Sequence, residues 1–432
     1  MMLIPAAWSA TPPCAVARVV LISSLVALGL ALPVAFGASA AFAQEASEAD
    51  GVSYAFGEGV TLRSGPHEAN LTAYTVGEIV GLDGGTPPLP SRADFRFLDL
   101  IGSFSLWDDR VTGVFVYDFQ NDVLPIENAK ITFRLTDEDA PLGMALTIGN
   151  HKEPFSMQAL NAAPQRLLNE PALPQTLAPG RDLGVSLGFF TAATTLTAGV
   201  FGENINEKDG AADGDDEWSL GARLTHAPVL NERDVLHFGV GATWERPGNR
   251  SVAFGPFPEI GQSDRPLIAT GPIGAIDAVG RFGLEAAWRR GPFLAQGEWI
   301  AADVTPTGDA SSTDAFFHGA YLNLSYALTG EVRPYLIEAD SDRTGVFGAL
   351  APDRAVSAGG AGAWEMQGRL SFLDLDDGPI RGGRQVEVSG GVTWAPEPNI
   401  RLDANLVHAR TREATSPDEH VTAATLRASV TW

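Results

Sequence analysis

The chain ends in the stretch Thr425-Leu426-Arg427-Ala428-Ser429-Val430-Thr431-Trp432. Its apolar side chains, from Leu426 to Trp432, alternate with polar ones, from Thr425 to Thr431. Such alternation is typical of a β-strand with one apolar and one polar face. In a transmembrane β-barrel the apolar face meets lipid, the polar face meets the lumen, and aromatic residues mark the membrane edge. The stretch therefore predicts the closing strand of an outer-membrane β-barrel.

The same alternation recurs along the chain, and charged residues in these segments keep to one face. Trp364 and Phe372, for example, share a face opposite Arg369. We predict an all-β, transmembrane antiparallel β-barrel of sixteen strands, an even number that leaves both termini in the periplasm. The predicted strands lie near residues 71–80, 93–106, 110–120, 128–136, 143–149, 182–190, 193–202, 216–226, 234–245, 277–289, 293–303, 315–327, 361–373, 384–395, 399–411 and 420–432.

Two features of this topology stay open at the level of sequence. A soluble β-sandwich would also alternate, but terminal Trp432 and aromatics near strand ends, such as Trp288 and Trp394, favour interfacial girdles. Residues 328–360 form a long connection that strand parity places on the periplasmic side. Within it, Glu331 to Glu338 could instead be a strand, in which case another predicted strand would be wrong. The other connections expected in the periplasm are mostly short, whereas those expected outside are longer and more acidic, such as Arg246 to Ile276.

The N-terminal region predicts export. Val19 to Leu32 is an apolar run followed by Pro33, and Ala41-Phe42-Ala43 is a cleavage site of the A-x-A type. An uncleaved anchor is the alternative, but the run is short for a spanning helix. We therefore predict a signal peptide at residues 1–43, an N-terminal periplasmic segment at 44–70 and the barrel at 71–432. This arrangement corresponds to the outer membrane of a Gram-negative cell.

Composition narrows the possible partners. The formal net charge of −24 at pH 7 argues against nucleic acid as a partner. Cys14 is the only cysteine, so no disulfide or thiolate metal site is expected. The acidic loop from Glu207 to Glu217 lacks the spacing of a calcium loop, and we expect loose binding of divalent ions at most. The seven histidines are scattered and no G-x-S-x-G motif occurs, so we expect no enzyme and no cofactor.

Specific motifs appear in the middle and C-terminal parts of the chain. Gly149-Asn150-His151-Lys152-Glu153-Pro154-Phe155-Ser156 is followed by Leu177-Ala178-Pro179-Gly180-Arg181-Asp182-Leu183-Gly184-Val185. Further matching pieces lie at 328–335, 362–366, 373–383 and 392–394. Together they resemble the phosphate-selective porin O and P family over roughly residues 70–432, with its G-x-x-K-E-P-F and A-P-G-R-x-L-G-V segments.

The resemblance implies a sixteen-stranded, trimeric outer-membrane porin whose loop after the fifth strand folds into the lumen. In this chain that loop is Asn150 to Gly180. A loop inside a barrel narrows the pore and brings side chains to permeating solutes. Lys152 could contact solute, or it could pair with Glu153 and only pin the loop to the wall. The constriction and lining residues that we predict are Lys152, Arg166, Arg181, Arg134, Arg223, Arg281, Arg369 and Arg401.

The expected function is a water-filled channel for passive diffusion of small inorganic or organic solutes, in contact with outer-membrane lipid. Family members favour anions, and phosphate or polyphosphate are candidate solutes here. The inward faces carry nearly equal numbers of basic and acidic residues, so the arginines could instead form a structural ladder in the wall. A non-selective channel, or a closed structural or receptor barrel, is the alternative. Small inward residues such as Gly241 and Gly283 favour open space over a packed interior.

Overall fold

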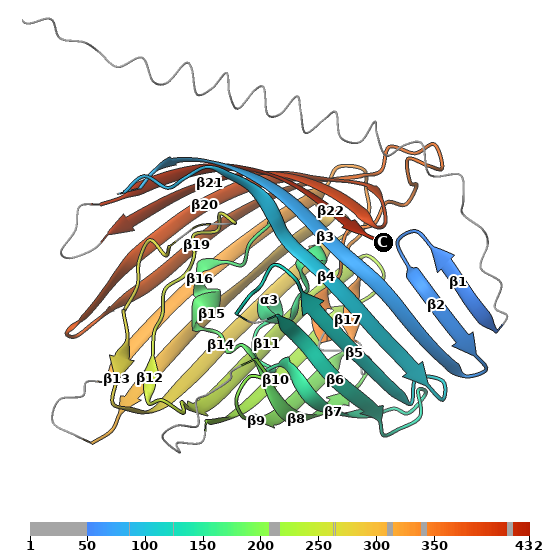
Figure 1. The fold of residues 1–432 in the computed structure, drawn as a ribbon, viewed down its shortest axis with the longest axis horizontal. Helices are drawn as coiled ribbons and strands as arrows, with labels where there is room; N and C mark the ends of the chain where they lie inside the picture. Colours follow the sequence, from blue (N-terminus) through green and yellow to red (C-terminus); the bar gives the residue numbers. More distant parts are fainter. Residues whose placement is uncertain are drawn as a thin grey trace, which may run out of the picture. The chain divides into compact units, whose positions relative to one another are not determined.

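The computed structural model describes residues 50–85, 87–123, 125–206, 217–261, 263, 265–308, 314–337, 344–412 and 418–432. Sixteen antiparallel strands, each hydrogen-bonded to its neighbours in the chain, form a closed barrel (Figure 1). They are β3 (His67–Gly84), β4 (Arg92–Leu106), β5 (Val111–Asp118), β6 (Ile126–Arg134), β7 (Gly143–Lys152), β8 (Arg181–Phe190), β9 (Thr194–Phe201), β10 (Trp218–Leu230), β11 (Asp234–Arg246), β14 (Ile276–Arg290), β15 (Phe293–Pro306), β16 (Ala315–Ala327), β19 (Ala363–Asp377), β20 (Ile380–Glu397), β21 (Ile400–Arg412) and β22 (His420–Thr431).

The last strand closes the barrel onto the first one. β22 pairs with β3 in antiparallel register, with Leu426 opposite Ile79. The terminal Trp432 exchanges two backbone hydrogen bonds with Ala73. Closure removes the free sheet edges that a membrane does not tolerate. The predicted all-β barrel and its sixteen strands are confirmed.

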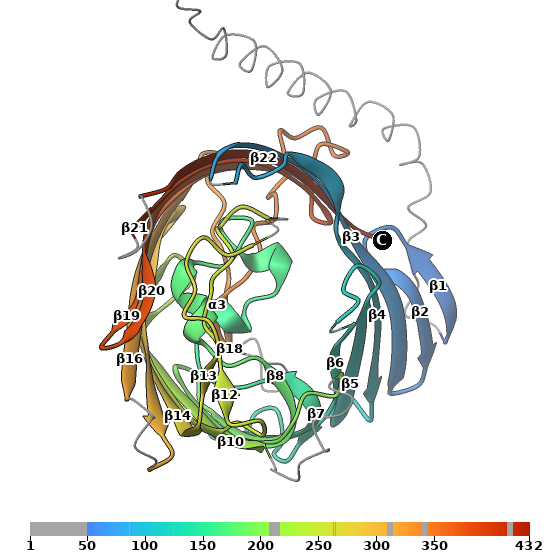
Figure 2. The same cartoon turned by 60° about the vertical axis from the view of Figure 1, so that its left-hand side comes forward.

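A short hairpin precedes the barrel and extends its sheet. β1 (Gly51–Ala55) pairs with β2 (Gly59–Ser64), and β2 pairs with the first residues of β3. β22 pairs with β3 only from Tyr74 onward, and β2 pairs with the part of β3 before it, as Figure 2 shows. The first barrel strand consequently begins at His67 rather than at residue 71. That residues 44–70 lie in the periplasm stays a prediction.

The register places charges inside and apolar side chains outside. Arg223 on β10 is 2% exposed, whereas Leu284 on β14 is 48% exposed on the outer face. Outward tryptophans pair across neighbouring strands, Trp218 with Trp244 at 4.7 Å between ring centroids and Trp364 with Trp394 at 5.4 Å. A barrel that shows this pattern meets lipid with its apolar face.

This register predicts where a charge is costly. We expect Leu284→Arg, near the middle of β14, to lower the free energy of unfolding in a lipid bilayer by about 2–4 kcal/mol. Leu328→Arg, just beyond the end of β16, is the matched control with an expected loss of about 0–1 kcal/mol. Equilibrium denaturant unfolding in vesicles measures both. Equal losses at the two positions would contradict the assigned membrane-facing band.

Three chain segments fold into the barrel. The first inserted segment is residues 153–180, with α3 (Met157–Leu160) and two 3-10 turns, η1 (Ala163–Gln165) and η2 (Leu173–Leu177). The second comprises the described residues between 247 and 275, with β12 (Ser251–Val252) and β13 (Ile273–Gly274). The third comprises residues 329–337 and 344–350, with β17 (Tyr335–Ile337) and β18 (Thr344–Phe347). Among the described residues, no helix is long and apolar enough to cross a membrane.

Apolar side chains of these segments pack against one another and against the wall. Phe155 and Leu173 of the first segment share a core with Phe254 of the second and Phe317 of β16. Met157 and Leu167 join a second core with Phe347 of the third segment. The segments are therefore a packed inner layer. The inward fold of the first segment was predicted, whereas the second was expected as an outer loop.

The open question about residues 328–360 is also answered. Tyr335–Ile337 is a strand, but it pairs only with Thr344–Phe347 in a separate two-stranded sheet inside the barrel. It adds no strand to the wall, and none of the sixteen predicted strands has to be withdrawn.

The inward glycines have a different role from the one that we expected. A Cβ atom at Gly241 would lie 2.1 Å from the backbone oxygen of Phe155, and one at Gly283 would lie 3.2 Å from the tip of its ring. Both contacts are closer than ordinary van der Waals contact. These two glycines thus accommodate the first inserted segment against β11 and β14, and the expectation that they indicate open space is wrong.

Candidate functional site

The inserted segments cover the inner face of the barrel on one side only. Inward side chains on β16 and β20, such as Asn323 and Glu387, are fully buried. On β4 to β7 the inward side chains of Ser103, Asn128 and Thr147 are only half-buried. Figure 2 shows the inserted segments nearer to β14–β20 than to β4–β6. Solvent therefore reaches parts of the inner wall along β4 to β7, although Thr132 and Ala145 on the same face are 2% exposed. This side is the candidate passage.

Basic residues gather where this side meets the first inserted segment. Lys130 on β6 lies opposite Gly149 of β7, and Lys152 at the end of β7 lies opposite Arg181 at the start of β8. The Lys152 ammonium donates a hydrogen bond to the backbone oxygen of Asn161 at 3.0 Å. Two of the predicted constriction residues thus sit side by side at the root of the inserted segment.

Two of the carboxylates near these cations have partners of their own. Arg181 Nη2 lies 2.9 Å from Glu127 Oε2. The Glu153 side chain accepts a hydrogen bond from Ser219 Oγ at 2.6 Å, which ties the segment to β10. Burial raises the pKa of Glu153, although the Ser219 hydroxyl and Arg281 oppose the shift. Glu153 therefore anchors the segment to the wall.

Arg166 lies in a cluster of charges on the first inserted segment. Its neighbours are Glu170, Arg96 and Arg427. Burial lowers the pKa of Arg166 to about 10, so it remains protonated at neutral pH. Burial would raise the pKa of Glu170, but Arg96 and Arg427 hold it below the usual range. The cluster thus holds three arginines, Arg96, Arg166 and Arg427, against two carboxylates, Glu170 and Glu78, both of which pair with Arg427.

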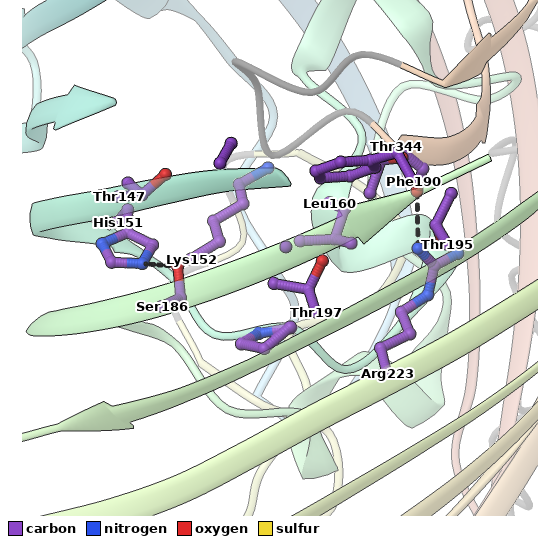
Figure 3. Close-up of a pocket in the computed structure, with 13 residues that line it drawn as sticks. Thr147, His151, Lys152, Leu160, Ser186, Phe190, Thr195, Thr197, Arg223 and Thr344 are labelled. Carbon is purple, nitrogen blue, oxygen red and sulfur yellow. Dashed lines mark hydrogen bonds between the residues drawn. The ribbon is translucent and has the colours of Figure 1, made fainter. Parts of the chain in front are cut away.

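A recess opens between the first inserted segment, the third one and the wall (Figure 3). The side chains that line it include no carboxylate. His151 Nε2 lies 2.9 Å from Ser186 Oγ, and Arg223 closes the far end through the backbone oxygen of Thr344. The residues that line the recess are Ala145, Thr147, His151, Lys152, Pro154, Leu160, Ser186, Gly188, Phe190, Thr195, Thr197, Arg223 and Thr344.

The predicted lining residues divide into two groups. Arg134, at the end of β6, is half-buried on the exposed side of the lumen together with Lys152, Arg166 and Arg181. The other four are held between wall and inserted segments by acidic partners. Arg223 pairs with Glu285, Arg281 with Glu245, Arg369 with Glu259 and Arg401 with Asp403. A role of all eight in contacting solute stays a prediction.

Three functional features were not found from sequence. Arg96 points to Glu170, with its Nη2 at 3.1 Å, because a β-bulge opposite Val76 and Gly77 interrupts the alternation of β4. Glu285 on β14 and Glu298 on β15 accept backbone N–H groups of the first segment, a role that an inward acidic residue does not reveal in sequence. Arg333 lies in the third segment, where no strand pattern indicates a direction. Only the bulge has a sequence signal, the break in period-2 patterning near residue 96.

Metal chemistry has no candidate in the described part of the chain. No group of three or more His, Cys, Asp or Glu side chains there could hold a metal ion. The acidic stretch proposed for loose cation binding lies at residues 207–216, outside the described residues.

The sequence model described as phosphate-selective porin O and P matches residues 112–432. The chain belongs to this family. Its membership and its closed barrel place it in the outer membrane and give it the fold of a channel rather than of an enzyme. The motifs around Lys152 and Arg181 lie within the matched region.

Individual related proteins share only modest sequence identity with this chain. The chain is 30% identical over 272 residues to an uncharacterized protein of Caulobacter vibrioides, covering 60% of this chain and 52% of that protein. It is 26% identical over 247 residues to Porin O of Pseudomonas aeruginosa, covering 51% and 53%. Its matches thus span about half the length of these curated relatives. OmpT of Vibrio cholerae, in its trimer form, has a similar fold, with a TM-score of 0.52 at 9% identity over 85% of this chain and 99% of that one.

Proposed function

We propose that this porin forms a passive channel for small solutes with a preference for anions. The observation that carries the proposal is the half-buried inner wall of β4 to β7, which runs past Lys130, Lys152 and Arg166. A passage lined by hydroxyl and amide groups remains wet, and fixed cations at its narrow point attract anions. Inorganic phosphate and small organic anions are the solute class that this chemistry fits.

The acidity of the whole chain does not oppose this preference. Charges exposed beyond a Debye length of about 8 Å are screened at physiological ionic strength. Inner-wall carboxylates such as Glu285, Glu365 and Asp403 are paired with arginines. On the proposed passage side, Asp118 accepts backbone N–H groups of Leu98 and Gln120, and Asp99 lies opposite it and is 8% exposed. We infer that the cations facing the passage dominate the local field at the constriction.

Exchanging these cations tests the proposal. Under a salt gradient across a planar bilayer, we expect the sign of the wild-type reversal potential to show that anions permeate more readily than cations. The double variant Lys152→Glu and Arg166→Glu should shift the reversal potential toward cations. Arg412→Glu also replaces a basic residue with an acidic one, but its side chain is 73% exposed at the rim. This control should leave the reversal potential unchanged. A cation-selective wild type, or an unchanged double variant, would refute the anion preference, and absence of conductance would favour a closed barrel.

We also propose a homotrimer in lipid, with export through cleavage after Ala43. The similar OmpT structure in trimer form supports the assembly. Mass spectrometry of the protein from outer membranes should show a mature chain beginning at Gln44. Light scattering in detergent should give three times that mass, and a monomeric mass would contradict the trimer.

A further inference from the structure

The stretch of the first inserted segment at residues 164–170, called the strap below, is held by arginines through its backbone. Arg401 Nη1 lies 2.9 Å from the oxygen of Pro164 and 2.8 Å from that of Arg166. Arg401 Nη2 reaches the oxygen of Leu167 at 3.3 Å. Three carbonyl groups of the strap backbone are thus bonded to one guanidinium group of β21.

Other arginines continue the same pattern along the strap. The contacts are Arg333 Nη1 to Gln165 O at 3.2 Å, Arg427 Nη1 to Asn169 O at 2.8 Å and Arg369 Nη1 to Glu170 O at 2.8 Å. The strap extends beyond the one-turn η1 without regular helix or strand. Buried backbone carbonyls need partners, and here cationic side chains supply them.

Each of these four arginines is also bound by a carboxylate, Arg427 by Glu78. Arg401 binds Asp403, Arg333 binds Glu365 and Arg369 binds Glu259, at 2.6 to 3.0 Å. The N–H groups of Arg401 all point at Asp403, Thr393 or the strap. A guanidinium group with its donors already used is poorly placed to bind a passing anion.

We propose that these inward arginines form a clamp that positions the strap and thereby sets the width of the channel. They act on the loop backbone rather than on the solute. The strap carries Arg166, so its position also determines how closely that cation approaches the passage. The proposal rests on the proposed channel function, which it deepens by assigning a positioning role to Arg401.

Replacing Arg401 with lysine separates the clamp from a role in solute binding. Lysine keeps the charge but lacks the planar fork that reaches three carbonyls. We expect the folded Arg401→Lys channel to conduct about twofold or more above wild type, with little change in reversal potential. Arg384→Lys is the matched control, because the partners of Arg384 are Asp374 and Asp376 rather than the strap. Wild-type conductance is expected for the control.

Labelling gives a readout that does not depend on conduction. Leu168 is 2% exposed within the strap, and the mature chain that we propose to begin at Gln44 contains no cysteine. In a Leu168→Cys background, a membrane-impermeant thiol reagent should react many times faster when Arg401→Lys is also present. If wild type does not conduct at all, the proposed function fails while the labelling still tests the clamp.

Each outcome decides the proposal. A wild-type conductance of Arg401→Lys, together with unchanged protection of the thiol introduced by Leu168→Cys, would overturn it. A shift in reversal potential without a rise in conductance would assign Arg401 to solute contact and would also overturn it. Should Arg401→Lys fail to fold, Arg369→Lys carries the same two expectations through the oxygen of Glu170.

Discussion

Replacing Gly241 with alanine is expected to displace the first inserted segment from the barrel wall and to raise the single-channel conductance about twofold or more. The added Cβ would lie 2.1 Å from the backbone oxygen of Phe155 and 2.9 Å from its carbonyl carbon. Backbone atoms cannot turn aside as the end of a side chain can. Phe155 is itself 1% exposed in a core with Leu173 and Leu177, so it has no free space to move into.

Planar-bilayer recordings of Gly241→Ala measure this effect, and Gly280→Ala is the control. A Cβ at Gly280, on the adjacent strand β14, meets no atom within 4 Å. Both variants add one methyl group to a wall strand, so differences in strand propensity cancel. The expected control result is wild-type conductance. If Gly241→Ala has the conductance of wild type, the first inserted segment can pack against the wall without this close contact, and the prediction is wrong.

Much of the barrel could be predicted because its signal is local. Alternation of lipid-facing and lumen-facing side chains, as in Leu402, Asp403 and Ala404, has a period of two residues and needs no knowledge of partners. Every predicted wall strand is found within a few residues. The inward fold of residues 153–180 followed from the motif that begins at Gly149, which only a family resemblance could interpret.

The inner layer could not be predicted from alternation. An inward carboxylate looks the same in sequence whether it faces water or a second layer of chain. Glu387, for example, is fully buried and accepts the backbone N–H of Glu259 from a segment 128 positions earlier. One signal was available in the second inserted segment, whose apolar residues Phe254, Ile260 and Ile268 are unusual for a loop expected in solvent.

Sequence also could not decide the role of the charged site residues, for the same reason. Sequence showed that Arg369 and Arg401 point inward, and it left open whether they bind solute or brace the wall. The decision depends on partners that lie far away in the chain, such as Glu259 for Arg369 and Pro164 for Arg401. The contacts favour bracing for these two residues, whereas Lys152 and Arg166 are among the half-buried cations on the side of the proposed passage.

Replacing Arg223 with methionine is expected to lower the free energy of unfolding by about 3–5 kcal/mol, since removal of one partner leaves a buried charge uncompensated. Arg223 Nη2 lies 2.6 Å from Glu285 Oε1, and both side chains are 2% exposed. His237 Nε2 also lies 3.1 Å from Glu285 Oε1. Without Arg223, the Glu285 carboxylate would be left with one histidine and the backbone N–H of Met157.

The second substitution Glu285→Gln is expected to restore most of this loss. A neutral amide needs no counter-ion, and its oxygen can still accept the hydrogen bond from Met157. Arg110→Met is the control, because Arg110 pairs with Asp137 at the rim, where both side chains are more than half exposed. An exposed pair contributes about 0–1 kcal/mol, so the control should lose little.

Denaturant unfolding in vesicles, followed by heat-modifiable gel mobility, measures all three proteins. The charge explanation requires Arg223→Met to be much less stable than both Arg110→Met and the double variant. If the double variant is no more stable than Arg223→Met, the loss arises from the hydrogen bonds of Arg223 to Thr344 and Gly345 in the third inserted segment. Arg223 would then stabilise the inner layer chiefly through backbone carbonyls, as Arg401 holds the strap.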